Sequence, residues 1–544
     1  MVTSQTSDGT GVAAAFNEAT KLQYINLSNK PPLYKVYPGL RAIPLPDVAA
    51  ASGLDMSTLR AIRGDGQSSG TESPPTLQTL AELLYHAAAV IRRRTLRDGE
   101  VHYRAAASAG ALYPTEVYVV CGDLEGLRAG VYHFNPLDFT LARLRNGDLR
   151  RWVAAAAQDH AAYPATLVFT TVFWRSAWKY RERGYRYCYW DLGTIAANLT
   201  AAGNATGTTV GLKFGFVDRS LTGFFGIDGV EEAPSLLATV GNPNGMLNPG
   251  SGDVPGMLPQ ESNELAAGAL DYPLSREVHL ASWLRTGEEV AAWNEPGGPG
   301  RGSDKDELDG TSDTFRPLRS GSDGNFNGEL DLAARPAQSL GECIRSRGST
   351  RRFATEPIAW EDFRSIVEAA GNPVNAPHLA DGFAPYLSVY LIVNSVTGLT
   401  SGAYYYNRFY NGLRLLKEGD FRENAGHLGF EQALPADAAT VAFITADLRL
   451  IEREFGPRGY RMAQTVAGII GGRIYLASHA LGLGATGLTF FDDAVVEFFG
   501  PHSPGQQAVF VVPMGIPHQD NRVRPFRSRL AVSLDSRARG AGQT

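Results

Sequence analysis

The chain has 544 residues, 44% of them hydrophobic, and a formal net charge of −6 at pH 7. Its length predicts two or more domains, and its composition suits ordinary globular cores. The net negative charge gives no general attraction to nucleic acid or to membrane phosphates, so neither is expected as a partner.

The N-terminal region, residues 1–55, is expected to be an extension outside the internal repeat described below. Its start, MVTSQTSDGTG, lacks the basic segment and apolar core of a secretory signal, and no apolar run in the chain approaches membrane-spanning length. Cys121, Cys188 and Cys343 form no CxxC pair, which argues against a disulfide framework or a zinc site and favours a reducing compartment. We therefore expect a soluble, cytoplasmic protein without a bound metal.

Two regions, residues 56–245 and 337–530, show the same coarse plan. Runs rich in β-branched residues predict strands: EVYVVC, TLVFTTVF and SLLATVG in the first region, and SVYLIVN, TVAFITADL and AVFVVPMG in the second. Each region also has apolar residues at helical spacing, namely Leu192, Ile195, Ala196 and Leu199, and Val466, Ile469, Ile470 and Ile474. Residues 246–336, rich in Gly, Pro, Ser and Asp, predict a linker with short helices, and residues 531–544 predict a flexible tail.

The two regions share motifs at nearly equal spacing. GVYHFNP, which begins at Gly130, has a counterpart in GAYYYNR, 272 residues later. DRSLTGFFG, which begins at Asp218, has a counterpart in DDAVVEFFG, 274 residues later. Because both matches keep the same order, they indicate an internal duplication. We predict an α+β protein in which two tandem domains, each a mixed sheet packed by long helices, form an intramolecular pseudo-dimer.

Three segments contain residues suited to binding a phosphate and a flat ring. Arg347, Ser349 and Arg351 alternate in RSRGSTRRF, so two guanidiniums and a hydroxyl can face one side; a solvated basic segment with a helix N-cap is the alternative. The glycines of GLGATG, residues 482–487, would let the backbone approach a ligand, or they form a helix C-cap and turn. SAGALYP, residues 108–114, has the same capacity for close approach, with a tight packing turn as the alternative.

This constellation resembles the nitroreductase-like FMN family, and SAGALYP followed by TEVYVV is similar to the SagB-type azoline dehydrogenases. FNEATK at 16–21, IPLP at 43–46 and WKYRERGYRY at 178–187 resemble further segments of that group. The resemblance implies two nitroreductase-like domains with FMN at their interface. It implies FMN contacts from Ser108, Ala109, Gly110, Ala111, Arg347, Ser349, Arg351, Gly484 and Ala485, with Arg522 or Arg524 adding a further contact.

The two halves retain complementary parts of this pattern. The second half has Arg-x-Ser-x-Arg, but FAPYLSVY stands where a second SAGALYP would be expected. The first half has SAGALYP, but AIRGDGQSSG and IRRRTLR are poor matches for the phosphate set. We therefore expect one composite FMN site, with the phosphate on the second half and the ring against the first.

The resemblance also implies oxidation of a thiazoline or oxazoline to the azole, with proton transfer by Lys179 or Tyr180. Neither side chain is a base at its ordinary pKa near 10, and neighbouring arginines are expected to lower that of Lys179: Arg175, Arg181, Arg183 and Arg186. A solvated, salt-bridged surface is the alternative for this segment. Its aromatic residues predict either a pocket wall or core: Trp174, Trp178, Tyr185, Tyr187, Tyr189 and Trp190.

The expected substrate is an azoline-containing peptide or a carrier-protein-bound chain, with a cyclodehydratase complex or a peptide synthetase as partner. Two other functions are compatible with the sequence. A general nitro- or quinone reductase would consume NAD(P)H and would not need Lys179. An inactive scaffold of a cyclodehydratase complex would not take up FMN.

Overall fold

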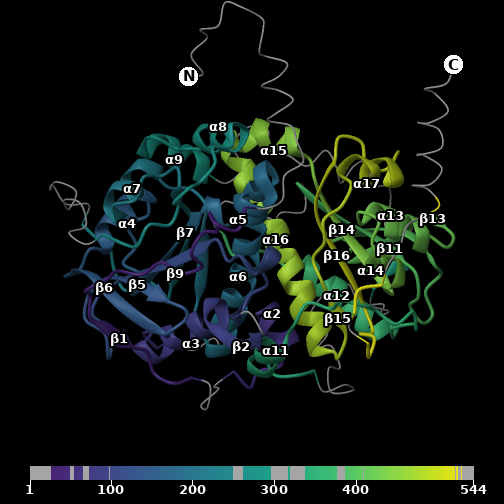
Figure 1. The fold of residues 1–544 in the computed structure, drawn as a ribbon, viewed down its shortest axis with the longest axis horizontal. Coiled ribbons are helices and arrows are strands. Elements are labelled where there is room, and N and C mark those ends of the chain that lie inside the picture. Colours follow the sequence, from purple (N-terminus) through teal and green to yellow (C-terminus); the bar gives the residue numbers. More distant parts are fainter. Residues whose placement is uncertain are drawn as a thin grey trace, which may run out of the picture.

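The computed structural model describes residues 26–48, 54–64, 73–96, 99–248, 261–295, 316–318, 337–376, 386–408, 410–520, 522–524 and 529 (Figure 1). FNEATK, residues 65–72, most of the linker, the FAP of FAPYLSVY and the expected tail lie outside these ranges. The described residues confirm the α+β class and the tandem plan, because each half contains its own seven-stranded sheet.

The two sheets have the same strand order, position for position. In the first the order is β1-β6-β5-β4-β7-β9-β8, with β1 (Ala42–Pro44), β4 (Thr115–Cys121), β5 (Gly130–Asn135), β6 (Thr140–Asn146), β7 (Ala165–Val172), β8 (Val210–Lys213) and β9 (Glu232–Val240). In the second it is β10-β13-β12-β11-β14-β16-β15, with β10 (Arg316–Pro317), β11 (Leu387–Val393), β12 (Gly402–Asn407), β13 (Gly412–Glu418), β14 (Thr440–Ala446), β15 (Gly484–Ala485) and β16 (Gln507–Gly515).

The expectation of mixed sheets needs correction. Every pairing between named strands in the described residues is antiparallel, including β4 with β7 and β11 with β14. Adjacent strands such as β5 and β6 are joined by short turns, which permit only antiparallel pairing. The central strands are nonetheless buried throughout, which explains their nearly continuous apolar runs. A separate hairpin, β2 (Val90–Leu96) and β3 (Gly99–Arg104), lies outside both sheets.

Helices surround each sheet in the same order, and among the described residues the second half has one helix more than the first. The first half contains α2 (Thr58–Arg63), α3 (Leu77–Ala88), α4 (Arg150–Ala156), α5 (Phe173–Tyr180), α6 (Gly184–Thr206) and α7 (Asp218–Phe225). The second contains α11 (Leu340–Ser346), α12 (Trp360–Gly371), α13 (Arg422–Leu428), α14 (Ala433–Asp437), α15 (Leu448–Phe455), α16 (Arg458–Ala480) and α17 (Asp492–Phe499). The described helices include none long and apolar enough to cross a membrane.

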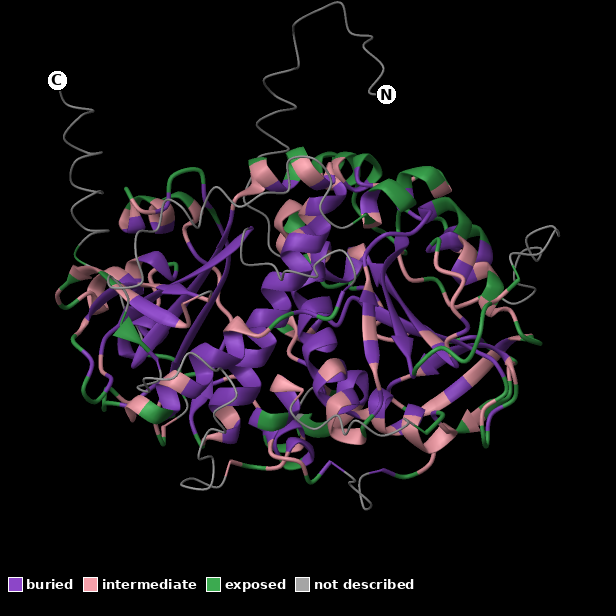
Figure 2. Ribbon diagram, turned by 180° about the vertical axis from the view of Figure 1, so that it is seen from behind, coloured by how far each residue is buried: buried purple, intermediate pink, exposed green. Residues whose placement is uncertain are grey.

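The two halves join through their longest helices, α6 and α16, which lie side by side at the centre of the molecule (Figures 1 and 2). Glycines allow the two backbones to touch. A Cβ on Gly193 would lie 2.1 Å from the Thr465 carbonyl oxygen, and one on Gly468 would lie 2.4 Å from that of Trp190. Because no real Cβ approaches so closely, any side chain at either position would separate the helices.

Ion pairs exchanged between the halves reproduce this pseudo-twofold relation. The tetrapeptide RGYR stands at the start of both central helices: Arg183 directly precedes α6, and Arg458 is the first residue of α16. Arg183 and Arg186 each donate to Asp492 at 2.7 Å, and Arg458 donates to Asp218 at 2.5 Å, as Arg461 does at 3.1 Å. The pseudo-dimer is thus held by two related interactions, one fully buried at Asp218 and one half-buried at Asp492.

The expected extension and linker both contribute to the folded halves. Strand β1, within residues 1–55, pairs with β6, and β10, within residues 246–336, pairs with β13. The linker also contains α8 (Pro273–Ala281) and α9 (Gly287–Asn294), which lie along one side of the molecule in Figure 1. The expected boundaries near 55, 245 and 336 stay predictions.

Candidate functional site

The SAGALYP loop has an unusual backbone that a buried carboxylate stabilises. Gly110, Ala111 and Tyr113 have φ angles of 65°, 54° and 47°, a region that residues other than glycine rarely adopt. The Ser108 hydroxyl donates to Asp191 at 2.5 Å, and the Ala109 N–H donates to the same carboxylate at 2.9 Å. Such backbone strain is common at functional sites, where the surrounding structure maintains it.

Asp191 lies on α6 and was not singled out from the sequence. Burial raises its pKa to about 7, while the hydrogen bonds from Ser108 and Ala109 act in the opposite direction. Its signal in the sequence is a carboxylate on an otherwise apolar, buried stretch of helix. Because Asp191 ties the loop to the central helix, it fixes the loop relative to the interface between the halves.

Lys179 and Tyr180, the predicted catalytic pair, lie directly against this loop. A Cβ on Gly110 would lie 2.7 Å from the Tyr180 hydroxyl oxygen and 3.1 Å from the Lys179 Nζ. Lys179 is exposed and Tyr180 is half-buried. Burial, and then the charge of Asp191, raises the pKa of Tyr180. Tyr180 therefore stays protonated near neutral pH and can donate a hydrogen bond.

The arginines expected to lower the pKa of Lys179 have other partners. Arg175 is fully buried and pairs with Glu116 at 2.6 Å. Arg183 and Arg186 pair with Asp492 across the interface. Their positive charge is therefore largely compensated, which corrects the expectation. Arg181 is exposed and follows directly after Tyr180.

The aromatic residues of this segment are mostly core. Trp174, Tyr185, Tyr187, Tyr189 and Trp190 are all buried. Trp178 is partly exposed, and its indole N–H donates to the Asn26 carbonyl at 2.9 Å. The sequence was compatible with either a pocket wall or a hydrophobic core. All of these residues except Trp178 belong to the core.

The second-half residues Arg347 and Ser349 meet at one tyrosine and reach the first half. The Arg347 guanidinium lies 5.3 Å from the Tyr475 ring centre and donates to the Ala105 carbonyl at 3.2 Å. The Ser349 hydroxyl lies 3.4 Å from the Tyr475 hydroxyl. Since Ala105 precedes SAGALYP by three residues, the structure brings these two predicted motifs together across the interface.

Gly484 and Ala485 form β15 and lie beneath the Arg347 loop. The Thr350 N–H donates to the Ala485 carbonyl at 3.1 Å, and a Cβ on Gly484 would lie 2.1 Å from the Thr350 hydroxyl. The glycine is therefore required for packing against Thr350. Both residues are buried, so they support the loop that carries the arginines.

The other three predicted arginines are placed differently. The charge of Arg351 acts to lower the pKa of Tyr180, against the larger effects of burial and Asp191. Arg351 also lines a hollow of about 240 Å³ together with Arg352, Asp437 and Arg524. Arg524 donates twice to Asp437, at 2.6 and 3.0 Å, and the exposed Arg522 pairs with Asp520. Arg524 and Arg351 thus line the same hollow, and a phosphate contact from Arg522 or Arg524 stays a prediction.

The arrangement around Arg347 fits an anionic group. Arg347 is only 7% exposed, and burial lowers the pKa of its guanidinium. No carboxylate among the described residues pairs with it, and its hydrogen-bond partner is a neutral carbonyl. A buried cation without a counter-ion is unfavourable, so a bound phosphate would stabilise this site. In the described part of the chain, no group of three or more His, Cys, Asp or Glu residues could hold a metal ion.

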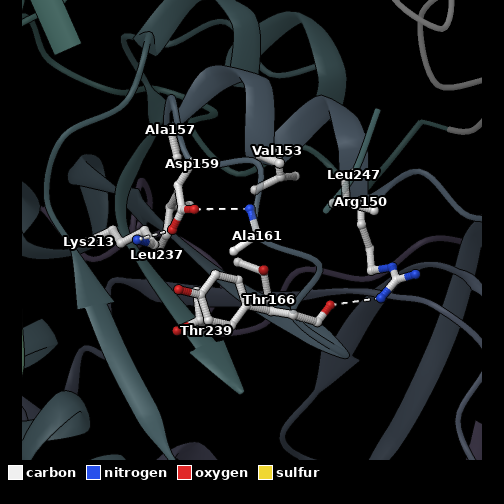
Figure 3. A pocket seen from close by; sticks show the side chains of 12 residues that line it. Arg150, Val153, Ala157, Asp159, Ala161, Thr166, Lys213, Leu237, Thr239 and Leu247 are labelled. Carbon is white, nitrogen blue, oxygen red and sulfur yellow. Dashed lines mark hydrogen bonds and ion pairs between the residues drawn. The ribbon is translucent and has the colours of Figure 1, made fainter. Parts of the chain in front are cut away.

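A second pocket, in the first half, shares no residue with this site (Figure 3). Its charged residues are already satisfied: Lys213 pairs with Asp159 at 2.5 Å, Asp159 accepts from the Ala161 N–H, and Arg150 donates to the Tyr163 carbonyl. The charged side chains of this pocket therefore need no charged ligand to compensate them. The three cysteines are free and buried.

Comparison with known proteins gives three related results. The Nitroreductase family matches residues 71–242 and again residues 344–516. The trifolitoxin-processing protein TfxB of Rhizobium leguminosarum bv. trifolii is 33% identical over 141 residues, which cover 24% of this chain and 38% of TfxB. The microcin B17-processing protein McbC of Escherichia coli is 28% identical over 145 residues, which cover 25% of this chain and 53% of McbC. The chain thus spans about half or less of these two relatives.

A solved structure matches the whole tandem arrangement. The crystal structure of a nitroreductase-like protein from Anabaena variabilis superposes with a TM-score of 0.69 and 24% identity, covering 93% of this chain and 99% of that one. At this identity the match shows the shared fold alone. Both halves and their interface therefore have a counterpart in a single solved chain.

Proposed function

Because the chain belongs to the nitroreductase family, we propose that it is an FMN-dependent oxidoreductase that converts thiazoline or oxazoline rings of a peptide substrate to azoles. The observation that carries this proposal is the position of Lys179 and Tyr180. Both side chains lie against Gly110, in a loop with an unusual backbone. The Arg347 segment of the other half reaches the residues just before this loop. We infer that this proton-transfer pair and this anion site would serve one cofactor bound between the halves.

Arg347 and Ser349 would hold the phosphate of FMN, and Ser108–Ala111 would face its ring. Arg351, two residues beyond Ser349 on the same segment, would add a further phosphate contact. When bound, FMN supplies a two-electron acceptor. Because Gly110 has no side chain, Lys179 and Tyr180 can lie directly against this loop.

Oxidation of an azoline ring releases two electrons and two protons, one proton departing with the electron pair as hydride. Lys179, in its neutral amine form, would take the other proton and become an ammonium group, because its exposed Nζ lies beside Gly110. Tyr180, held in its protonated form by burial, would donate a hydrogen bond that orients the substrate ring. Asp191 would keep the loop in place from below.

The duplicated half supports a single site per chain. The alignment of α5 with α15 places Glu454 and Phe455 where the first half has Lys179 and Tyr180. Phe455 is buried, and Trp293 of α9 covers it and donates to its carbonyl at 2.9 Å. In sequence, Ile62-Arg63 of α2 aligns with Ile344-Arg345 of α11, so the first half has Asp65 and Gln67, which lie outside the described residues, where the second half has Arg347 and Ser349. Each half therefore lacks what the other retains.

The relatives support a peptide substrate. Two of them are named as processing proteins of trifolitoxin and microcin B17. We extend this role to the present chain, with a cyclodehydratase complex as the source of the azoline rings and the cytoplasm as the compartment. A carrier-bound substrate delivered by a peptide synthetase would present the same ring to the same site.

A single-turnover experiment tests the activity. Purified protein loaded with FMN is mixed without oxygen with a thiazoline- or oxazoline-containing peptide. We expect bleaching of the flavin absorbance and a product lighter by two hydrogen atoms, in an amount equal to the FMN. Lys179→Ala should lower the rate by about 10²- to 10⁴-fold while flavin stays bound. Arg181→Ala, a nearby exposed cation, is the matched control and should react normally.

Two outcomes contradict the proposal. Rapid oxidation of NAD(P)H with nitro compounds or quinones, without any azoline oxidation, would assign the chain to the general reductases. Undiminished azoline turnover in Lys179→Ala would remove Lys179 from the mechanism.

A further inference from the structure

The hairpin of β2 and β3 extends an arginine-rich strand from the first half. Arg92, Arg93 and Arg94 are consecutive and exposed on β2. Because side chains alternate along a strand, Arg92 and Arg93 face opposite sides. Arg93 donates to the Leu137 carbonyl within the first half at 3.2 Å, whereas Arg92 stacks on Tyr103 at 4.8 Å.

Arg92 reaches the phosphate-binding loop of the other half. Its Nη2 atom lies 3.6 Å from the position that a Cβ on Gly348 would occupy. Gly348 is the residue between Arg347 and Ser349. A guanidinium from the first half therefore lies beside the second-half segment that carries Arg347, while Arg347 itself donates to the Ala105 carbonyl of the first half.

A third basic group lies near these two arginines. The His479 ring nitrogen Nε2 is 3.2 Å from the Ser346 hydroxyl, at the start of the same loop. Burial lowers the pKa of His479, and the charges of Arg347 and Arg92 lower it further. Arg92 also acts, after burial, to lower the pKa of Arg347. Arg92, Arg347 and His479 are thus close enough to repel one another when charged.

No carboxylate of the described ranges pairs with Arg92, Arg347 or His479. Like charges gathered in this way are unfavourable unless an anion lies among them. Two guanidiniums and neighbouring hydroxyl and amide groups form the donor set that recognises a phosphate monoester.

We propose that Arg92 is a phosphate ligand, so that the phosphate end of the FMN site is itself built from both halves. This inference rests on the proposed flavin site. Arg92 would act in addition to Arg522 or Arg524, the further contact expected from the sequence; in this structure these two arginines pair with Asp520 and Asp437. It also gives the interface a role in cofactor affinity, because Arg92 can reach the phosphate only when the halves are docked.

Comparison of FMN with riboflavin, which lacks the phosphate, tests this proposal. Binding to flavin-free protein is followed by flavin fluorescence for the wild type, Arg92→Ala and Arg93→Ala. We expect Arg92→Ala to weaken FMN binding by about 10- to 100-fold and to change riboflavin binding by less than about 2-fold. Arg93→Ala, on the opposite face of the same strand, should bind both flavins as the wild type does.

Equal FMN affinity in Arg92→Ala and the wild type would overturn the proposal, and so would an equal loss for FMN and riboflavin. If the wild type binds neither flavin, the proposed function fails, and the anion site is judged with inorganic phosphate instead. Phosphate should then raise the melting temperature of the wild type and of Arg93→Ala but not that of Arg92→Ala. Equal shifts in all three proteins, or no shift in any, would overturn the site itself.

Discussion

Replacement of Asp218 by Asn should destabilise the pseudo-dimer strongly. Asp218 is fully buried and accepts from Arg458 at 2.5 Å, from Arg461 at 3.1 Å and from the Leu284 N–H at 2.9 Å. Asn keeps the shape but removes the negative charge, which leaves two buried guanidiniums without a counter-ion. Breaking a buried pair in this way costs about 3–5 kcal/mol. Burial already lowers the pKa of Arg458 to about 10, which shows how unfavourable a charge is at this position.

Asp492→Asn provides the matched comparison at the pseudo-equivalent position. Its partners, Arg183 and Arg186, are 30% and 19% exposed, so water can solvate them once the carboxylate is lost. We expect a loss of about 1 kcal/mol. Guanidinium denaturation followed by tryptophan fluorescence measures both variants. Equal losses for the two, or a loss below about 1 kcal/mol for Asp218→Asn, would refute the reasoning that burial decides the contribution.

Three further outcomes follow from the site. Gly110→Ala should slow azoline oxidation at least about 10-fold with flavin retained, because the new Cβ would displace Tyr180. Gly207→Ala is the control and should not slow it, because Gly207 has a similar φ of 68° but no atom lies within 4 Å of its Cβ position. Asp191→Asn should flatten the pH dependence of stability. The folded pKa of Asp191 is raised from 3.8 to about 7, so its contribution is full below about pH 4 and is lost as pH rises through 7, by about 4 kcal/mol in the wild type only. Gly468→Leu should weaken association of the central helices and lower the melting temperature; an unchanged value would contradict the close contact with Trp190.

Much of the fold could be predicted because duplication makes the pattern visible twice. The six strands read from β-branched runs and the two central helices are all present. The sequence could not indicate that the sheets are antiparallel, because strands buried on both faces look alike in either pairing. The edge strands β1 and β10 are too short, at three and two residues, to give a periodic signal.

The site was predictable where chemistry is concentrated in one segment. Gly110 lies against Lys179 and Tyr180, and Arg347 reaches Ala105 just before the same loop, while the roles of these residues stay predictions. Residues that reach the site only through the tertiary fold could not be predicted. Asp191 is a single carboxylate on a long helix, and Arg92 belongs to a basic run that resembles a solvated strand. The sequence also gives no sign that Arg524 pairs with Asp437, because these two residues are 87 positions apart in the chain.

The ratio of FMN to protein tests the central claim, a single site composed from both halves, most directly. Protein saturated with FMN and freed of excess is measured by flavin absorbance against protein concentration, for the wild type and for Arg347→Ala combined with Arg351→Ala. The composite site predicts a ratio near one for the wild type and loss of most of the flavin in the double variant. A ratio near two, or full retention of FMN after both arginines are removed, would contradict it.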